Sequence, residues 1–141
     1  METVNATQIT LESTINAPIS KVWNYWTSPE HITKWNQASD DWCCPASEND
    51  VRVGGKFKHT MADKDGSFSF DFEGEYNKVI ENQSIESKLE DGRTIKVLFE
   101  DMGGQTLVKK VFDPEATNSI DMQKAGWQAI LDSFKKYTEG N

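Results

Sequence analysis

The residues from Asn118 to Tyr137 read NSIDMQKAGWQAILDSFKKY, and their pattern predicts one long amphipathic helix. Apolar side chains recur at the three- and four-residue spacing that places them on one helical face, namely Ile120, Trp127, Ile130, Leu131, Phe134 and Tyr137. We expect Asn118 to cap this helix and Gly140 to stop it. At 1.5 Å per residue the helix is about 30 Å long, which is enough to cross a small sheet. The preceding residues should therefore supply that sheet.

The composition is that of one globular domain spanning residues 1–141, with 36% hydrophobic and 27% charged residues. No apolar run approaches the roughly 20 residues of a membrane span, and Met1 to Gln8 lack the apolar core of a secretory signal. We therefore expect a cytoplasmic protein with no membrane partner. The net charge of -8 repels phosphate backbones and the lysines are not clustered, so we expect no nucleic-acid partner either.

The amino-terminal part predicts a strand followed by two short helices. Polar and apolar residues alternate from Gln8 to about Asn16, as in a half-buried strand. Pro18 favours the start of a helix, and Ser28 followed by Pro29 favours a second helix that ends near Trp35. Residues 36–50 are interpreted as a loop that carries Trp42 and two adjacent cysteines, Cys43 and Cys44, which we expect to be reduced.

From Val51 onward the pattern has period two, interrupted by turn dipeptides at 65–66, 91–92 and 103–104. The predicted strands are Val53 to Met61, Ser67 to Val79, Ser84 to Glu90, Thr94 to Asp101 and Gln105 to Phe112. With the first strand they form a meandering antiparallel sheet of six strands, or seven if 50–52 pairs separately. In the second of these strands Phe68, Phe70 and Phe72 share one face, which we expect to pack against the long helix, and Asp71, Glu73 and Glu75 share the other face.

Several strings resemble a known family. They are INAPISKVW at 15–23, WTSPEHI at 26–32, DVRVGGKF at 50–57, FEGEY at 72–76, FED at 99–101, GGQT at 103–106 and GW at 126–127. They resemble START-related, birch-pollen-allergen-like domains of the SRPBCC superfamily, in the branch named after the activator of the heat-shock protein 90 ATPase. The resemblance runs from about Thr7 to Tyr137. It implies an α+β helix-grip fold, in which a curved antiparallel sheet of six to seven strands wraps around the C-terminal helix, two short helices follow the first strand, and an apolar cavity lies between sheet and helix.

Candidate catalytic residues are few. His31 lies in the first turn of a short helix and is expected at the surface. His59 alternates with Phe57 and Met61 and is expected on the cavity face, either as a hydrogen-bonded core residue, which we favour, or as a general acid or base. Neither His-Glu-x-x-His nor Cys-x-x-Cys occurs, so we predict no metal and no cofactor.

Lys110 has two possible orientations. If Val108 and Phe112 face inward, so does Lys110, and a buried lysine would need a carboxylate or an anionic ligand. If Leu107 and Val111 face inward instead, Lys110 lies in water. We favour the first register.

We therefore predict binding of a small hydrophobic, aromatic or lipid-like ligand by a monomer or weak dimer. We expect the ligand-binding residues to come from the strand positions that face the cavity, from the apolar face of the long helix, and from the second short helix and the loop after it. They are Trp35, Trp42, Phe57, His59, Phe70, Phe72, Lys110 and Trp127. One alternative is a co-chaperone-type interaction with a chaperone partner in the stress response. The other is a cyclase- or hydrolase-like reaction in the same cavity, which would depend on His59.

Overall fold

The computed structural model of the chain describes residues 8–116 and 118–141. Its elements are β1 (Ile9–Ile15), α1 (Ile19–Thr27), α2 (Pro29–Trp35), β2 (Trp42–Asn49), β3 (Lys56–Asp63), β4 (Ser69–Ile80), β5 (Ser84–Leu89), β6 (Thr94–Asp101), β7 (Thr106–Phe112) and α3 (Ile120–Gly140). Both short helices and the long C-terminal helix are confirmed. Of the polar segment from Met1 to Gln8, only Gln8 lies among the described residues.

The strands form one antiparallel sheet in the order β1-β7-β6-β5-β4-β3-β2. The seventh strand is β2, in the segment predicted as a loop, so that part of the loop prediction is wrong. β2 pairs with β3 from Trp42 opposite Asp63 to Asn49 opposite Phe57, and its register shifts between Cys43 and Ala46. This irregularity, next to Pro45, which has no backbone N–H to donate, breaks the period-two pattern that would have identified a strand.

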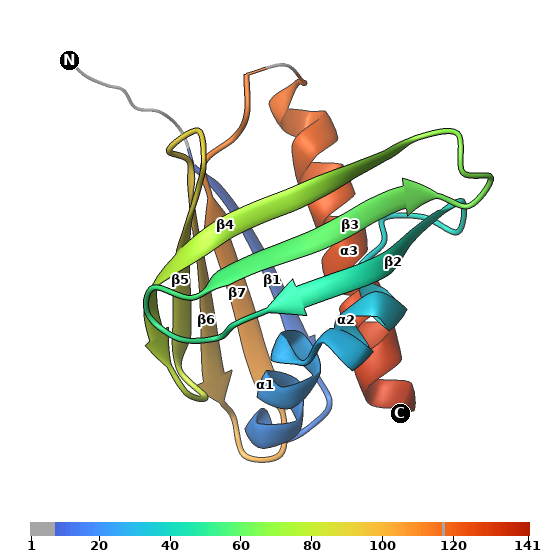
Figure 1. Cartoon of the computed structure of the whole chain (residues 1–141). Helices are drawn as coiled ribbons and strands as arrows, with labels where there is room; N and C mark the ends of the chain where they lie inside the picture. Colours follow the sequence, from blue (N-terminus) through green and yellow to red (C-terminus); the bar gives the residue numbers. More distant parts are fainter. Residues whose placement is uncertain (1–7, 117) are drawn as a thin grey trace.

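The sheet curls around α3, with β1 packed against the helix and β2 to β4 crossing over it (Figure 1). This is the α+β arrangement of the helix-grip fold. α3 begins one residue later than predicted, because the hydroxyl of Ser119, and not Asn118, accepts a hydrogen bond from the backbone N–H of Met122. The helix also continues through Gly140. Ile120, the first residue of the expected stripe, is exposed, so the buried face of the helix begins further along.

The phenylalanine row, with Phe68 just before β4 and Phe70 and Phe72 on it, is only partly covered, contrary to the expectation that the whole row packs on α3. Phe68 and Phe70 are 56% and 46% exposed, whereas Phe72 lies 5.3 Å from Trp127 of α3, centroid to centroid. The reason is the length of the β3–β4 hairpin, whose tip extends past the helix (Figure 1). Phe72 lies where the hairpin crosses α3, and Phe68 lies beyond it.

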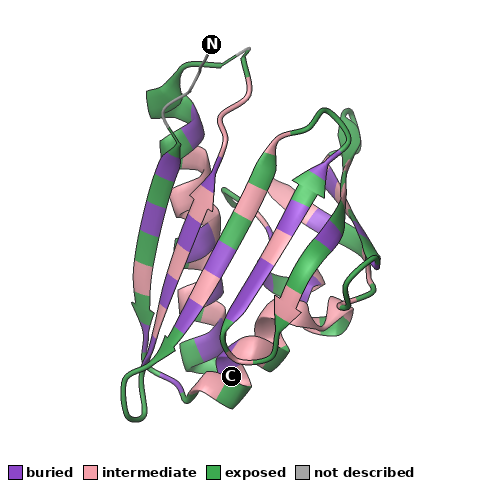
Figure 2. Cartoon of the chain, turned by 90° about the vertical axis from the view of Figure 1, so that its left-hand side faces the viewer, coloured by how far each residue is buried: buried purple, intermediate pink, exposed green. Residues whose placement is uncertain are grey.

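Along the strands, buried residues alternate with more exposed ones (Figure 2). Asp71, Glu73 and Glu75 are exposed on the outer face as predicted. On β7 the buried residues are Thr106, Val108, Lys110 and Phe112, which confirms the register that turns Lys110 inward. No helix in the described part of the chain is long and apolar enough to cross a membrane.

Candidate functional site

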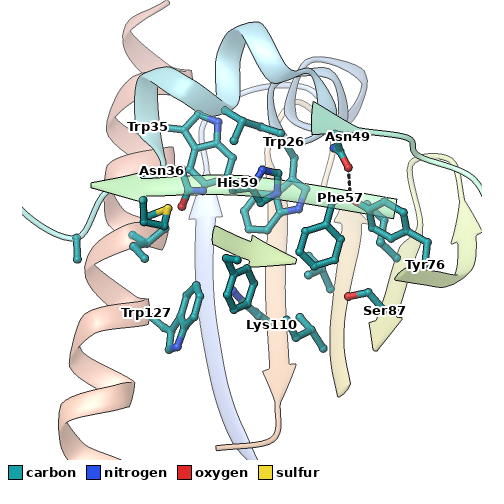
Figure 3. Close-up of a pocket in the computed structure, with 18 of the residues that line it drawn as sticks. Trp26, Trp35, Asn36, Asn49, Phe57, His59, Tyr76, Ser87, Lys110 and Trp127 are labelled. Atoms are coloured by element: carbon teal, nitrogen blue, oxygen red, sulfur yellow. Dashed lines mark hydrogen bonds between the residues drawn. The ribbon is translucent and has the colours of Figure 1, made fainter. Parts of the chain in front are cut away.

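A cavity of about 330 Å³ lies between the sheet and the helices (Figure 3). All eight residues selected from the sequence line it: Trp35, Trp42, Phe57, His59, Phe70, Phe72, Lys110 and Trp127. Their proximity is a feature of the structure, and their role in binding stays a prediction. The lining also includes residues that were not selected from the sequence as ligand-binding residues: Trp26, Ile32, Asn36, Ala38, Asn49, Met61, Tyr76, Ile85, Ser87, Ile95, Val97 and Ile130.

Aromatic rings build the wall on the helical side. Trp26 of α1 and Trp35 of α2 stack with centroids 5.1 Å apart, and each meets the edge of Phe134 of α3 at 4.9 Å. The indole N–H of Trp35 donates to the backbone carbonyl of Tyr25 at 2.9 Å, which fixes its ring and satisfies its donor. The rings are thus held by contacts outside the cavity and present apolar faces to it.

On the sheet side the ring of Phe57 stacks on that of His59, with centroids 5.2 Å apart. Gly74 is the cross-strand partner of Phe57 on β4. A Cβ at position 74 would lie 2.6 Å from Cε2 of Phe57, so only glycine leaves room for this ring position. The sequence signal was present, since Gly74 interrupts an otherwise regular aromatic strand.

His59 is a hydrogen-bonded residue of the cavity wall, in agreement with the favoured interpretation. Its Nδ1 lies 2.9 Å from Oγ of Ser47, the directly opposite residue on β2. Burial, and secondly the positive charge of Lys110, lower the pKa of His59 to about 4. The imidazole is therefore neutral at physiological pH. Ser47 does not line the cavity, so this serine and histidine do not form a nucleophile pair facing a bound molecule.

Lys110 is the only charged side chain in the described lining. It is 9% exposed, and its cross-strand neighbours are Leu11 on β1 and Val97 on β6. Its Nζ lies 3.8 Å from the centroid of the Trp127 ring. Among residues 8–116 and 118–141 no hydrogen bond or ion pair reaches this ammonium group, and burial lowers its pKa to about 7.

Other polar groups of the lining are largely satisfied within the protein. The hydroxyl of Tyr76 donates to Oδ1 of Asn49, whose Nδ2 donates to the carbonyl of Thr27 at 2.7 Å. Burial raises the pKa of Tyr76, so its phenol stays protonated. Ser87 differs, because it is a buried residue of the cavity lining whose hydroxyl forms no hydrogen bond within the described chain. Ser87 could have been predicted from the sequence, because it lies two residues after Ile85 on β5 and therefore on the same face of the sheet. Asn49 could not, because it lies in the segment that was interpreted as a loop.

His31 lies away from the cavity, where it is half-buried by aromatic contacts and not fully exposed to solvent. Its ring stacks on Tyr25 with centroids 3.9 Å apart, and its Nδ1 lies 2.8 Å from the hydroxyl of Tyr137. The residue is half-buried because α2 packs against α3. Helical position alone could not reveal this contact between residues far apart in the sequence.

No group of three or more histidine, cysteine or acidic side chains that could hold a metal ion occurs within the described residues. Cys43 and Cys44 are free thiols. Cys44 is buried, its thiol donates to the carbonyl of Ala46 at 3.4 Å, and burial raises its pKa. It is therefore a small packed side chain rather than a metal ligand.

Comparison with known proteins finds one family and several similar structures. The family described as "Activator of Hsp90 ATPase homolog 1-like protein" matches residues 16–139. The chain is 42% identical to an AHSA1-like protein from Aeromonas hydrophila, over 95% of this chain and 93% of that one, with a TM-score of 0.89. It is 52% identical to Chr148 from Cytophaga hutchinsonii, with the same coverage and a TM-score of 0.81.

A more distant structure, CV1439 from Chromobacterium violaceum, shares the fold, with 19% identity, coverage of 96% and 100% and a TM-score of 0.85. Comparison with curated protein sequences finds no match.

Proposed function

We propose that this chain, which belongs to the family of activator of Hsp90 ATPase homolog 1-like proteins, binds a small, predominantly apolar ligand. The binding site is the cavity between the sheet and the helices described above. The observation that carries this proposal is an apolar space of about 330 Å³ in the middle of the fold. Protein interiors are close-packed and rarely leave voids larger than a water molecule. An apolar space of this size gains free energy when an apolar molecule fills it.

The size and lining support a small ligand with an aromatic or short aliphatic body. The volume lies near the lower end of the roughly 300–1,000 Å³ typical of ligand pockets. Aromatic rings enclose the space from both sides, with Trp26 and Trp35 on the helices, Phe57 on the sheet and Trp127 on α3. Such rings offer flat faces on which a planar molecule stacks at little conformational cost.

The exposed aromatic residues support an entrance at one end of the cavity. Phe70 and Ala38 line the cavity and are exposed, and Trp42 meets Phe70 edge-on at 6.2 Å. Phe68 extends this rim, 6.0 Å from Phe70. The exposed aromatic surface of the β3–β4 hairpin thus adjoins the cavity mouth. This position is compatible with ligand entry, and the co-chaperone-type interaction, together with a chaperone partner, stays a prediction.

The enzymatic alternative also stays a prediction, with one candidate group. His59 is neutral and could accept a proton, but its Nδ1 is engaged by Ser47. In the described chain no carboxylate hydrogen bonds to it, so the third member that orients a catalytic histidine is missing there. A binding role requires no such group.

The experiment compares two phenylalanine substitutions on neighbouring positions of β6. Val97 is buried and lines the cavity, and Leu98, next to it, points to the other face of the sheet. We expect Nile red, a neutral apolar dye, to bind the wild type and Leu98→Phe saturably, and Val97→Phe at least about tenfold more weakly, since the new ring fills the space. Equal binding by all three proteins, or no saturable binding by the wild type, would refute the proposal.

A further inference from the structure

The Lys110 ammonium is a buried charge without a counter-charge. Its side chain is 9% exposed, and no carboxylate of the described chain forms an ion pair with it. The ion pairs that lysines do form in the described chain lie on the surface, as between Lys109 and Glu12 at 3.8 Å. Buried charges in proteins are normally paired, because removal from water is costly. The partner of Lys110 is therefore to be sought in the cavity.

Apolar and aromatic side chains surround Lys110, among them the Phe112 ring, whose centroid lies 5.6 Å from Nζ. Leu11 and Val97 flank it within the sheet, and the Trp127 ring covers Nζ from the side of α3 at 3.8 Å. The cation–π contact with Trp127 compensates part of the hydration that the ammonium group loses on burial. It does not provide a hydrogen-bond acceptor such as a carboxylate or carbonyl oxygen. The ammonium group has three N–H donors, and the remaining ones are available to a molecule in the cavity.

We propose that the ligand is a carboxylic acid with an aromatic or short aliphatic body, and that its carboxylate is bound by Lys110 while its body fills the aromatic part of the cavity. This inference rests on the proposed function and specifies its ligand class. A single positive charge matches a monoanion. The unpartnered Ser87 hydroxyl and the His59 ring, which face the same cavity (Figure 3), are uncharged groups that can add hydrogen bonds but no second positive charge.

The pH dependence follows from the titratable groups that line the cavity together with Lys110. These are His59 from β3 and Tyr76 from β4, while β1, β6 and α3 contribute apolar or aromatic side chains. With its pKa lowered to about 7, Lys110 of the free protein loses its proton above neutral pH. Tyr76 stays protonated and His59 stays neutral over the same range. Affinity for a carboxylate should therefore fall as the pH rises through about 7, whereas affinity for an uncharged isostere should not change.

The test uses p-butylbenzoic acid and its uncharged isostere p-butylbenzamide, titrated by calorimetry against the wild type, Lys110→Met and Lys109→Met. Lys109 is the adjacent residue on the outer face and serves as the matched control. At about pH 6 the wild type and Lys109→Met should bind the acid at least about tenfold more tightly than the amide, and Lys110→Met should lose this preference. Thermal unfolding establishes that each variant is folded, and the wild-type comparison requires no variant at all.

The inference is overturned if the wild type binds acid and amide equally, or if its preference for the acid is unchanged above pH 7 or in folded Lys110→Met. Equal binding would mean that the cavity selects by shape alone, and a preserved preference for the acid would mean that a group other than Lys110 recognises the carboxylate. In either case the proposed function would stand. If neither compound nor Nile red binds, the proposed function itself fails.

Discussion

Replacing Lys110 with methionine should stabilise the protein, although it removes the only charged side chain of the described cavity lining. The pKa of this buried lysine lies at about 7 instead of its ordinary 10.5. At about 1.36 kcal/mol per pH unit, this difference makes the charged form about 5 kcal/mol less favourable in the folded than in the unfolded chain. Methionine has a similar length and no charge, so the expected gain near pH 6 is up to about 5 kcal/mol.

The gain should depend on pH in a defined direction. Between pH 7 and 10.5 the unfolded chain keeps the lysine proton that the folded chain has released, so wild-type stability rises with pH across this window. Lys110→Met has no such contribution. The difference in unfolding free energy between the two proteins should therefore be largest below pH 7 and shrink toward pH 10.5.

The assay is urea unfolding followed by tryptophan fluorescence at about pH 6 and about pH 9.5, with the free energy extrapolated to water. Lys109→Met is the control, and its exposed ion pair should change stability by less than about 1 kcal/mol at either pH. A loss of stability in Lys110→Met at pH 6, or a gain of equal size at both pH values, would refute the reasoning that Lys110 is buried as an unpaired charge.

Three further substitutions test the packing around the cavity. Phe134→Ala should cost about 3–5 kcal/mol in urea unfolding, because Phe134 is 0% exposed and holds two tryptophan rings; a loss below about 1 kcal/mol would mean that it is not core. Gly74→Ala should cost about 1–3 kcal/mol and weaken Nile red binding, since the new Cβ displaces the Phe57 ring; unchanged stability and binding would contradict this. Wild-type stability should fall as the pH drops from 6.5 to about 4, by up to about 3 kcal/mol from His59, and His59→Phe should lack that part of the acid slope in pH-dependent unfolding; equal slopes would show that His59 is not buried as a neutral ring.

Regular periodicity explains which parts of the fold could be predicted. β6 runs from Thr94 to Asp101 and α2 from Pro29 to Trp35, as expected, because turn dipeptides and the serine–proline start mark their ends. The resemblance to the family is confirmed by the match over residues 16–139. β2 was missed because its bulge hides the alternation, and Ser119 rather than Asn118 caps α3 because either residue type suits that position.

Strand parity likewise explains what could be predicted of the site. It placed Phe57, His59, Phe72 and Lys110 on one face, and all of them line the cavity. Parity does not say where a strand leaves the helix, so the exposure of Phe70 at the rim was unexpected. Contacts between segments far apart in sequence, such as Tyr76 with Asn49, depend on how the sheet curls and carry no local signal.

Ligand entry into the cavity can be observed most directly through the tryptophan indole N–H signals in NMR spectra of the labelled protein. Four of the five tryptophans, Trp26, Trp35, Trp42 and Trp127, line the cavity, whereas Trp23 packs outside it against Phe99 at 5.2 Å and is an internal reference. On titration with p-butylbenzoic acid or p-butylbenzamide, we expect saturable shifts of the four cavity signals while the Trp23 signal stays in place. Four stationary cavity signals at saturating concentrations of both compounds, or shifts confined to Trp23, would contradict ligand binding in the cavity.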